Sequence, residues 1–144
     1  MTRYTDIHRR PIVDTGSATT VAEVDGIVID PATATVAALG THGRRDHAVV
    51  HWPDITGVGD AVTVASSAAV RTADGRAAEL SGPQHDPLRK RLLTEAGNEI
   101  GRVVDIDFDP RSGRIVGLMT ESGTVDGERL IGCGSYAVVV RGDG

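Results

Sequence analysis

Three histidines lie close together in the chain and are the first residues whose types could do chemistry. His42, His47 and His51 fall within one stretch of ten residues, and imidazole nitrogens are common zinc ligands. Their spacing matches no compact zinc motif, and the single cysteine, Cys133, lies far away in the sequence. The pattern favours a flexible polar loop, with zinc binding as the alternative, and we expect no metal and no other cofactor.

Cys133 is also a candidate nucleophile, in the segment Gly132-Cys133-Gly134-Ser135. A nucleophilic thiol needs a lowered pKa and a partner base, and no histidine is near it in the sequence. A small residue in a glycine-rich turn explains the cysteine equally well. The chain has no Gly-x-Ser-x-Gly elbow and no phosphate loop ending in Gly-Lys-Ser/Thr. We therefore expect that the protein is not an enzyme.

The acidic run Asp105-Ile106-Asp107-Phe108-Asp109 suggests calcium as a ligand. A calcium-binding EF-hand loop needs glycine at its sixth position and a carboxylate at its twelfth, and Pro110 and Val116 stand there instead. Alternate residues of a strand also lie too far apart to surround one ion. The run is therefore interpreted as the solvated face of a strand.

The densest basic patch is Arg89-Lys90-Arg91, and Arg9 and Arg10 stand at the corresponding place nearer the N-terminus. Phosphate binding is one interpretation of these residues. No aromatic side chains interleave with them for base stacking, and the formal net charge of the chain is -5. Solvated strand ends are the better interpretation, so we expect no nucleic acid partner and keep RNA or ribosome-precursor association as the alternative function.

Composition indicates how such residues are positioned. The chain has 144 residues, of which 40% are hydrophobic and only 3% aromatic, so Val, Ile, Leu and Ala must build the core. Branched side chains favour strands. A single cysteine allows no internal disulfide and fits a reducing cytoplasm. The N-terminus has no apolar leader and no apolar run reaches about 20 residues, so we expect a soluble, cytoplasmic protein without membrane insertion.

An internal repeat organises the chain. Residues 21–31 resemble residues 100–110 at an offset of 79, in an alignment that begins with Val13 opposite Leu92. After a loop of different length, 62–64 matches 138–140 at an offset of 76. Few residues are identical between the two segments. The match depends on the same alternation of apolar residues and on an Asp-Pro turn that both segments contain. The repeat predicts two related halves.

Each half has the pattern of short strands joined by turns. The second half predicts a tight turn at 109–113, where Gly113 supplies a positive φ. Ala34 stands at the equivalent place in the first half, so that turn is predicted to be more strained or differently shaped. Helical spacing is limited to 76–80. The predicted strands of the second half are 91–93, 101–108, 114–120, 130–131 and 137–141.

Period-two alternation assigns strand faces. Val104, Ile106 and Phe108 are predicted to face the core, and Asp105 and Asp107 the solvent. In the first half, Val24, Gly26 and Val28 occupy the face that is acidic in the second. A large apolar outer surface is usually covered by another part of the protein or by a partner. This face is therefore a candidate protein-interaction face, against the other half or against a second chain. The alternative is that these are isolated exposed valines, which are common.

These residues resemble the PRC-barrel family, named for the H subunit of the photosynthetic reaction centre and shared with the C-terminal domain of the ribosome maturation factor. The resemblance rests on Glu99–Ile106, the turn and strand Asp109–Leu118, and Val138–Val140. The first half matches more weakly, over Val24–Leu39. Leu130-Ile131-Gly132 stands where the family often has a proline. The resemblance implies a small β-barrel that acts as an adaptor and carries no catalytic residues.

Together these features predict an all-β protein of two tandem small PRC-barrel-like β-barrels related by internal duplication. The first unit spans 1–69, a linker 70–88, and the second unit 89–144. The expected function is that of a non-enzymatic adaptor or scaffold in a bacterial cytoplasm. It would bind a protein partner through the outer surface of the barrel pair and could form a homodimer, because strand edges need covering.

Overall fold

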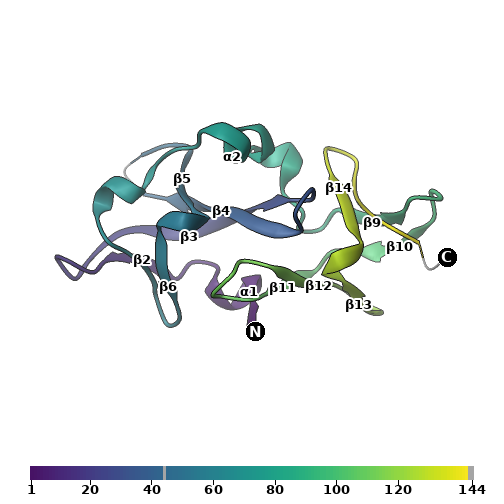
Figure 1. The fold of residues 1–144 in the computed structure, drawn as a ribbon, viewed down its shortest axis with the longest axis horizontal. Coiled ribbons are helices and arrows are strands. Elements are labelled where there is room, and N and C mark those ends of the chain that lie inside the picture. Colours follow the sequence, from purple (N-terminus) through teal and green to yellow (C-terminus); the bar gives the residue numbers. More distant parts are fainter. Residues whose placement is uncertain (44, 143–144) are drawn as a thin grey trace.

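The computed structural model describes residues 1–43 and 45–142 and is built mainly of strands (Figure 1). The elements of the first half are β1 (Thr2–Arg3), α1 (Tyr4–Ile7), β2 (Pro11–Asp14), β3 (Thr19–Asp30), β4 (Thr35–His42), β5 (Ala48–His51), η1 (Trp52–Asp54), β6 (Ile55–Val58), β7 (Val62–Val64) and η2 (Ser67–Ala69). The connecting segment carries β8 (Arg71–Thr72), α2 (Gly75–Leu80) and η3 (Pro83–His85). The second half contains β9 (Arg91–Thr94), β10 (Glu99–Arg102), β11 (Asp105–Phe108), β12 (Ile115–Thr120), β13 (Gly123–Asp126), η4 (Gly127–Arg129), β14 (Leu130–Cys133) and β15 (Ala137–Val140).

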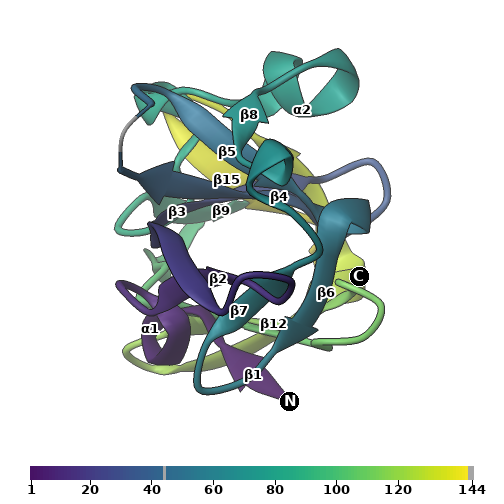
Figure 2. The same ribbon diagram turned by 90° about the vertical axis from the view of Figure 1, so that its left-hand side faces the viewer.

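The two halves use the same order of strand pairing. In the first half β2 pairs with β3, β3 with β4, β4 with β5 and β6 with β7, all antiparallel, and β2 pairs with β7 in parallel. In the second half β9 pairs with β10, β11 with β12, β12 with β13 and β14 with β15, again antiparallel, and β9 pairs with β15 in parallel. Figure 2 shows the strands of the first half curling around their interior. The all-β prediction is confirmed.

The structure corrects the alignment of the first strand by one residue. Ile12 pairs with Val62 as Leu92 pairs with Val138, so Ile12 and not Val13 is the counterpart of Leu92. The hairpin after the strand is one residue shorter in the second half, because Thr94 closes it on Asn98 whereas Asp14 pairs with Thr19. Over β3 and β4 the offset of 79 holds, as Val24 with Val103 and Leu39 with Leu118 show.

One continuous core joins the halves. Its buried members include Ile12, Leu39 and Val64 from the first half and Leu92 and Phe108 from the second. The indole ring of Trp52 meets the ring of Phe108 edge-on, with centroids 5.8 Å apart and an interplanar angle of 89°. Apolar burial across this boundary therefore stabilises both halves at once.

The strand predicted over 101–108 is broken, and this reverses two assignments. β10 ends at Arg102 and β11 begins at Asp105, so the period-two alternation does not run through the segment between them. Val104, predicted to face the core, is 40% exposed, and Asp105, predicted to face solvent, is 7% exposed. Its carboxylate accepts hydrogen bonds from the amide and hydroxyl of Thr5, which anchors α1 on the second half.

The Asp-Pro turns take the predicted conformations. Gly113 has φ 77° and Ala34 has φ 53°, so both occupy the left-handed region, and alanine bears the strain that glycine avoids. The connecting segment is more regular than expected of a linker. It includes β8 on the edge of β5 and α2, which forms where helical spacing was seen.

Candidate interaction surface

The outer side of the sheet β10–β9–β15–β14 forms a surface that we call the C-terminal sheet face. Leu92 and Val138 are fully buried, so their neighbours in sequence point the other way. Leu93 and Val139 are register partners on β9 and β15 and are half-buried. Ile131, in the bulge of β14, is 43% exposed. These three side chains give the face an apolar centre.

One end of the C-terminal sheet face carries an arginine against an aromatic ring. The guanidinium of Arg91 lies 4.8 Å from the ring centroid of Tyr136, and its Nη1 donates to the tyrosine hydroxyl at 3.3 Å. Arg91 also pairs with Glu99 at 3.5 Å, and its register partner is Arg102. Tyr136 is 66% exposed. An exposed aromatic ring held by an arginine is a typical protein-binding feature.

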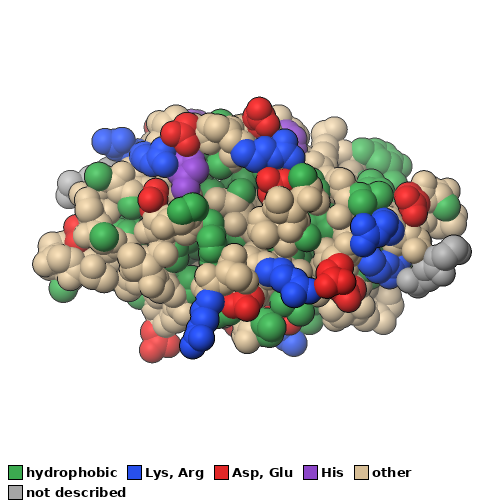
Figure 3. All heavy atoms as spheres, viewed as in Figure 1, with side chains coloured by type: hydrophobic (Ala, Val, Ile, Leu, Met, Phe, Trp, Pro, Cys, Tyr) green, Lys and Arg blue, Asp and Glu red, His purple; other side chains and the backbone are tan. Residues whose placement is uncertain are grey.

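The other end gathers three arginines around η4. Arg129 Nε donates to the carbonyl oxygen of Arg141 at 2.8 Å, and Arg141 Nη2 donates to the carbonyl oxygen of Glu128. Arg114 forms an ion pair with the Glu128 carboxylate. At the right-hand end of Figure 3, hydrophobic side chains lie beside Lys and Arg side chains over the C-terminal strands. The face is therefore apolar in the middle and basic at both ends.

The equivalent side of the first half has a different chemistry. Thr63 stands where Val139 stands in the ladder, and Thr56 occupies the bulge position of Ile131. Asp54 is the last residue of η1 as Arg129 is of η4. Val13, the register partner of Thr63, keeps an apolar side chain where Leu93 stands. Apart from this valine, the surface is hydroxylated and acidic in the first half, whereas it is apolar and basic in the second.

The chain covers its other apolar outer face itself. On the outer side of β3, β4 and β5, Val28, Ala38 and Val49 form a small second core with Ala77 and Leu80 of α2. In Figure 1, α2 lies over β4 and β5.

The matching side of the second half carries residues that need no such cover. Asp107, Gly117 and Thr124 occupy the positions that Val28, Ala38 and Val49 hold in the first half. On this side of the fold the apolar face of the first half is therefore covered by α2, and the polar face of the second half has no covering helix within the described residues.

That arrangement corrects the interaction face predicted in the first half. Val24 is fully buried in the main core, and Val28 is 8% exposed beneath α2. A β-bulge between Val24 and Gly26 shifts the alternation, so the two valines point to opposite sides of β3. Gly26 lies opposite Gly40 and is half-buried. The three residues do not form one exposed face.

The two predicted basic sets do occupy equivalent places. Arg9 and Arg89 both have φ 70°, and their amides donate to Val24 and Val103 respectively. The structure brings Arg91 into the C-terminal sheet face. Arg9 and Arg10 remain at the start of β2, where Arg10 Nη1 donates to the carbonyl oxygen of a glycine in the β6–β7 connection. Lys90 is half-buried.

The histidines are separated by the fold. His42 and His47 line a pocket of about 600 Å³ together with His85, whereas His51 lies elsewhere with its Nε2 3.1 Å from an Asp74 carboxylate oxygen. Within residues 1–43 and 45–142, no three His, Cys, Asp or Glu side chains are grouped closely enough to hold a metal ion.

Cys133 is half-buried, and its thiol donates to the backbone carbonyl of His85 at 3.3 Å. Burial raises the pKa of Cys133 to about 11, with Lys90 opposing and Asp86 adding to the shift. A nucleophilic thiol requires a lowered pKa, so this environment matches the small-residue interpretation.

Sequence reasoning missed the C-terminal sheet face because its members are distant in the chain. Ile131, Tyr136 and Val139 appear individually as ordinary strand and turn residues. The available signal was the repeat itself, since the offset of 76 sets Val139 against Thr63. The equivalence of Ile131 and Thr56 follows only from the matching bulges in β14 and β6. A systematic comparison of outward positions would have revealed the contrast.

Comparison with known proteins agrees with this architecture. No helix of the described chain has the length and apolar character needed to cross a membrane. A search of curated proteins finds no match. The model of the PRC-barrel domain family matches residues 83–144, which begin at η3 and include every strand from β9 to β15. The C-terminal part of this chain is therefore a PRC-barrel domain.

Proposed function

We propose that this protein is a non-enzymatic adaptor that binds another protein through the C-terminal sheet face. One contrast carries the proposal. The chain covers the apolar outer side of β3–β5 with its own helix α2, whereas Ile131 and Tyr136 remain 43% and 66% exposed. An apolar surface that its own chain leaves open is suited to a partner.

The charges of the face define the partner's chemistry. Arg91 and Arg102 lie at one end, and Arg129 and Arg141 lie at the other, in a chain whose formal net charge is -5. A segment with apolar side chains flanked by carboxylates would complement this pattern. Such charges act mainly on association rate and specificity, while burial of Ile131 supplies affinity.

A matched pair of variants tests the proposal. The wild-type chain, Ile131→Asp and Thr56→Asp are used to capture partners from the native cell, followed by quantitative mass spectrometry and titration of the captured protein. Ile131→Asp should weaken binding at least about tenfold, because a carboxylate cannot be buried in an apolar interface without a partner. Thr56→Asp, at the equivalent site of the first half, should bind as the wild type does. Equal retention by both variants would contradict the proposal.

RNA is the competing outcome of the same experiment, because Tyr136 with Arg91 offers an aromatic ring and a cation together. Binding to phosphates is lost steeply as salt increases. An apolar protein interface loses little affinity over the same range. If the chain captures RNA and its affinity falls steeply with added salt, the protein is an RNA-binding protein and the adaptor function is wrong.

We further propose that the first half is a second PRC-barrel-like unit produced by duplication. The repeated pairing order and the left-handed Arg9 and Arg89 support this proposal. A cytoplasmic location and a homodimer remain predictions from the sequence. Cell fractionation tests the first and sedimentation equilibrium the second.

A further inference from the structure

One strand edge of the second half lacks the cover that its counterpart has. β5 pairs with β4 on one side and with β8 on the other, where Ala48 is opposite Thr72 and Val49 is opposite Arg71. β13 is the last strand of the sheet β1–β11–β12–β13, and within the described residues only β12 pairs with it. Unpaired backbone groups on a strand edge are a template for an additional strand.

The register shows which residues would receive that strand. Leu39 pairs with Val50 in the first half as Leu118 pairs with Val125 in the second. Gly123 and Thr124 therefore take the places of Ala48 and Val49. Both residues are exposed, so an incoming chain can reach them without rearrangement of β13.

The side chains favour an extended occupant over a helix. On the first half α2 packs on apolar Val49 and Ala38. On the second half, a Cβ added to Gly117 would lie 2.6 Å from Thr124 Cγ2, so the threonine side chain lies directly over the glycine. Asp107 lies on the other side of the same glycine, so this surface is polar and gives a helix little apolar area to bury. Pairing with a strand requires only the backbone groups of the edge.

The strand that pairs with β13 should carry the opposite charge to β8. Arg71 of β8 forms an ion pair with Asp54 at 3.6 Å, and Arg129 holds the place of Asp54 in the second half. Arg114 and Arg141 lie nearby, bound to the side chain and the backbone of Glu128 respectively. Asp126 accepts a hydrogen bond from the Glu128 amide, so it caps η4. The preferred side chain opposite Thr124 is consequently an acid.

We propose that β13 binds an extended acidic segment of a partner protein as an added antiparallel strand. The segment pairs with Gly123 and Thr124 as β8 pairs with Ala48 and Val49, and it places a carboxylate toward Arg129. This edge belongs to a different sheet from the C-terminal sheet face, and the two surfaces share the arginines around η4. Ile131 lies on the C-terminal sheet face and not on this edge, so a variant of Ile131 distinguishes the two binding events.

Two synthetic peptides test the proposal. The first has the sequence of residues 68–74, which contains β8, and the second has the same sequence with Arg71→Glu. Each is titrated at millimolar concentration into the full ¹⁵N-labelled chain. The Arg71→Glu peptide should shift the amide signals of Gly123, Thr124 and Val125. It should bind roughly two- to fivefold more tightly than the unmodified peptide, as one exposed ion pair allows.

Charge variants of the protein complete the test. Arg129→Glu should reverse the preference between the peptides, and Arg129→Gln should abolish it. Arg111→Glu, an equal charge change at an exposed turn residue, should leave it intact, and so should Ile131→Asp. The proposal is wrong if neither peptide binds, if the shifts fall elsewhere, or if Arg111→Glu changes the preference as much as Arg129→Glu does.

Discussion

Thr35 and Arg114 pair with each other in an isolated antiparallel bridge and hold equivalent positions in the two halves. Val36 N donates to Gly113 O at 2.7 Å, and Ile115 N donates to Ala34 O at 2.8 Å. Val36 is equivalent to Ile115, and Gly113 is equivalent to Ala34, so the two hydrogen bonds are equivalent to each other. The halves therefore meet at this point as two subunits do across a two-fold axis, with each surface contacting its own equivalent.

The turns beside this bridge should respond oppositely to substitution. A Cβ at Gly113 would lie 2.8 Å from Trp52 Cε2 and would add left-handed strain. Gly113→Ala should lower the free energy of unfolding by about 2 kcal/mol or more, measured by urea denaturation.

Ala34→Gly is the matched variant. It removes a left-handed penalty of about 1–2 kcal/mol at an entropic cost of about 0.5–1 kcal/mol. The free energy of unfolding should rise by up to about 1 kcal/mol. Equal losses in both variants would contradict the conformational argument.

The Asp105–Thr5 contact should anchor the N-terminal segment. The carboxylate accepts bonds from Thr5 Oγ1 and from the amides of Thr5 and Ile106. Asp105→Ala leaves these donors without an acceptor and should cost about 2–3 kcal/mol of the free energy of unfolding. A double-mutant cycle with Thr5→Ala should give a coupling of about 1 kcal/mol or more, and additive losses would count against the contact.

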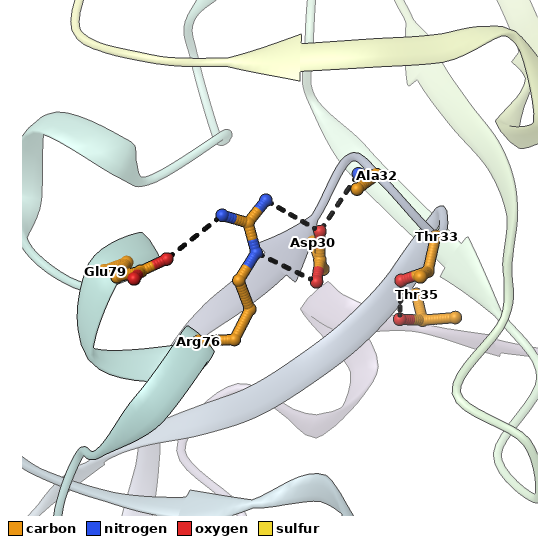
Figure 4. Close-up of polar contacts among 6 residues, drawn as sticks. All are labelled: Asp30, Ala32, Thr33, Thr35, Arg76 and Glu79. Carbon is orange, nitrogen blue, oxygen red and sulfur yellow. Dashed lines mark hydrogen bonds and ion pairs between the residues drawn. The ribbon is translucent and has the colours of Figure 1, made fainter.

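Acid should weaken the attachment of α2. Arg76 Nε and Nη2 each donate to Asp30 at 3.2 Å (Figure 4), and these bonds hold the pKa of Asp30 below its usual range. The folded chain thus favours the ionised carboxylate. Its contribution is complete above the unfolded pKa of about 4 and is lost as pH falls through the lower folded pKa.

Comparison of the wild type with Asp30→Asn measures this effect. The free energies of unfolding should differ by about 1 kcal/mol at neutral pH and converge near pH 2. Asp60→Asn, at an exposed position in the β6–β7 connection, serves as the control and should differ from the wild type by less than about 0.5 kcal/mol. A gap for Asp30→Asn that persists in acid would exclude the ion pair as its cause.

The Cys133 thiol should be protected in the folded chain. Because burial raises its pKa to about 11, alkylation by iodoacetamide at neutral pH should be more than about 100-fold slower than in the unfolded chain. The folded state favours the protonated thiol, so its stabilising effect is complete below about pH 8.5 and is lost as pH rises toward 11. Cys133→Ala should remove that alkaline loss, and rapid native alkylation would refute the assignment.

Local rules predicted much of the fold because they depend on neighbouring residues. The abundance of branched side chains predicted an all-β fold. The Asp-Pro pair followed by Gly113 predicted the tight turn between β11 and β12. The repeat placed Ala34 opposite Gly113 and left open whether that turn is strained or differently shaped; the structure gives Ala34 the same left-handed backbone. The family resemblance of the second half is confirmed by the match over residues 83–144.

Alternation failed where the backbone departs from regular pairing. The break before Asp105 leaves Val104 exposed and Asp105 buried, whereas Ile106 and Phe108 keep their predicted core positions. The bulge between Val24 and Gly26 turns Val28 to the opposite side of β3 from Val24. Neither irregularity has a local signature in these residues. The partner of Asp105 is a hundred residues away, and α2 covers Val28 only because the chain returns over β4, which no short window of sequence contains.

The position of β1 has a consequence for the order in which the chain folds. Thr2 and Arg3 pair with Phe108 and Asp107 on β11, so this pairing closes a loop of about a hundred residues. Contacts between residues so distant in sequence form slowly, so β1 should dock only after the local hairpins β2–β3 and β3–β4 have formed.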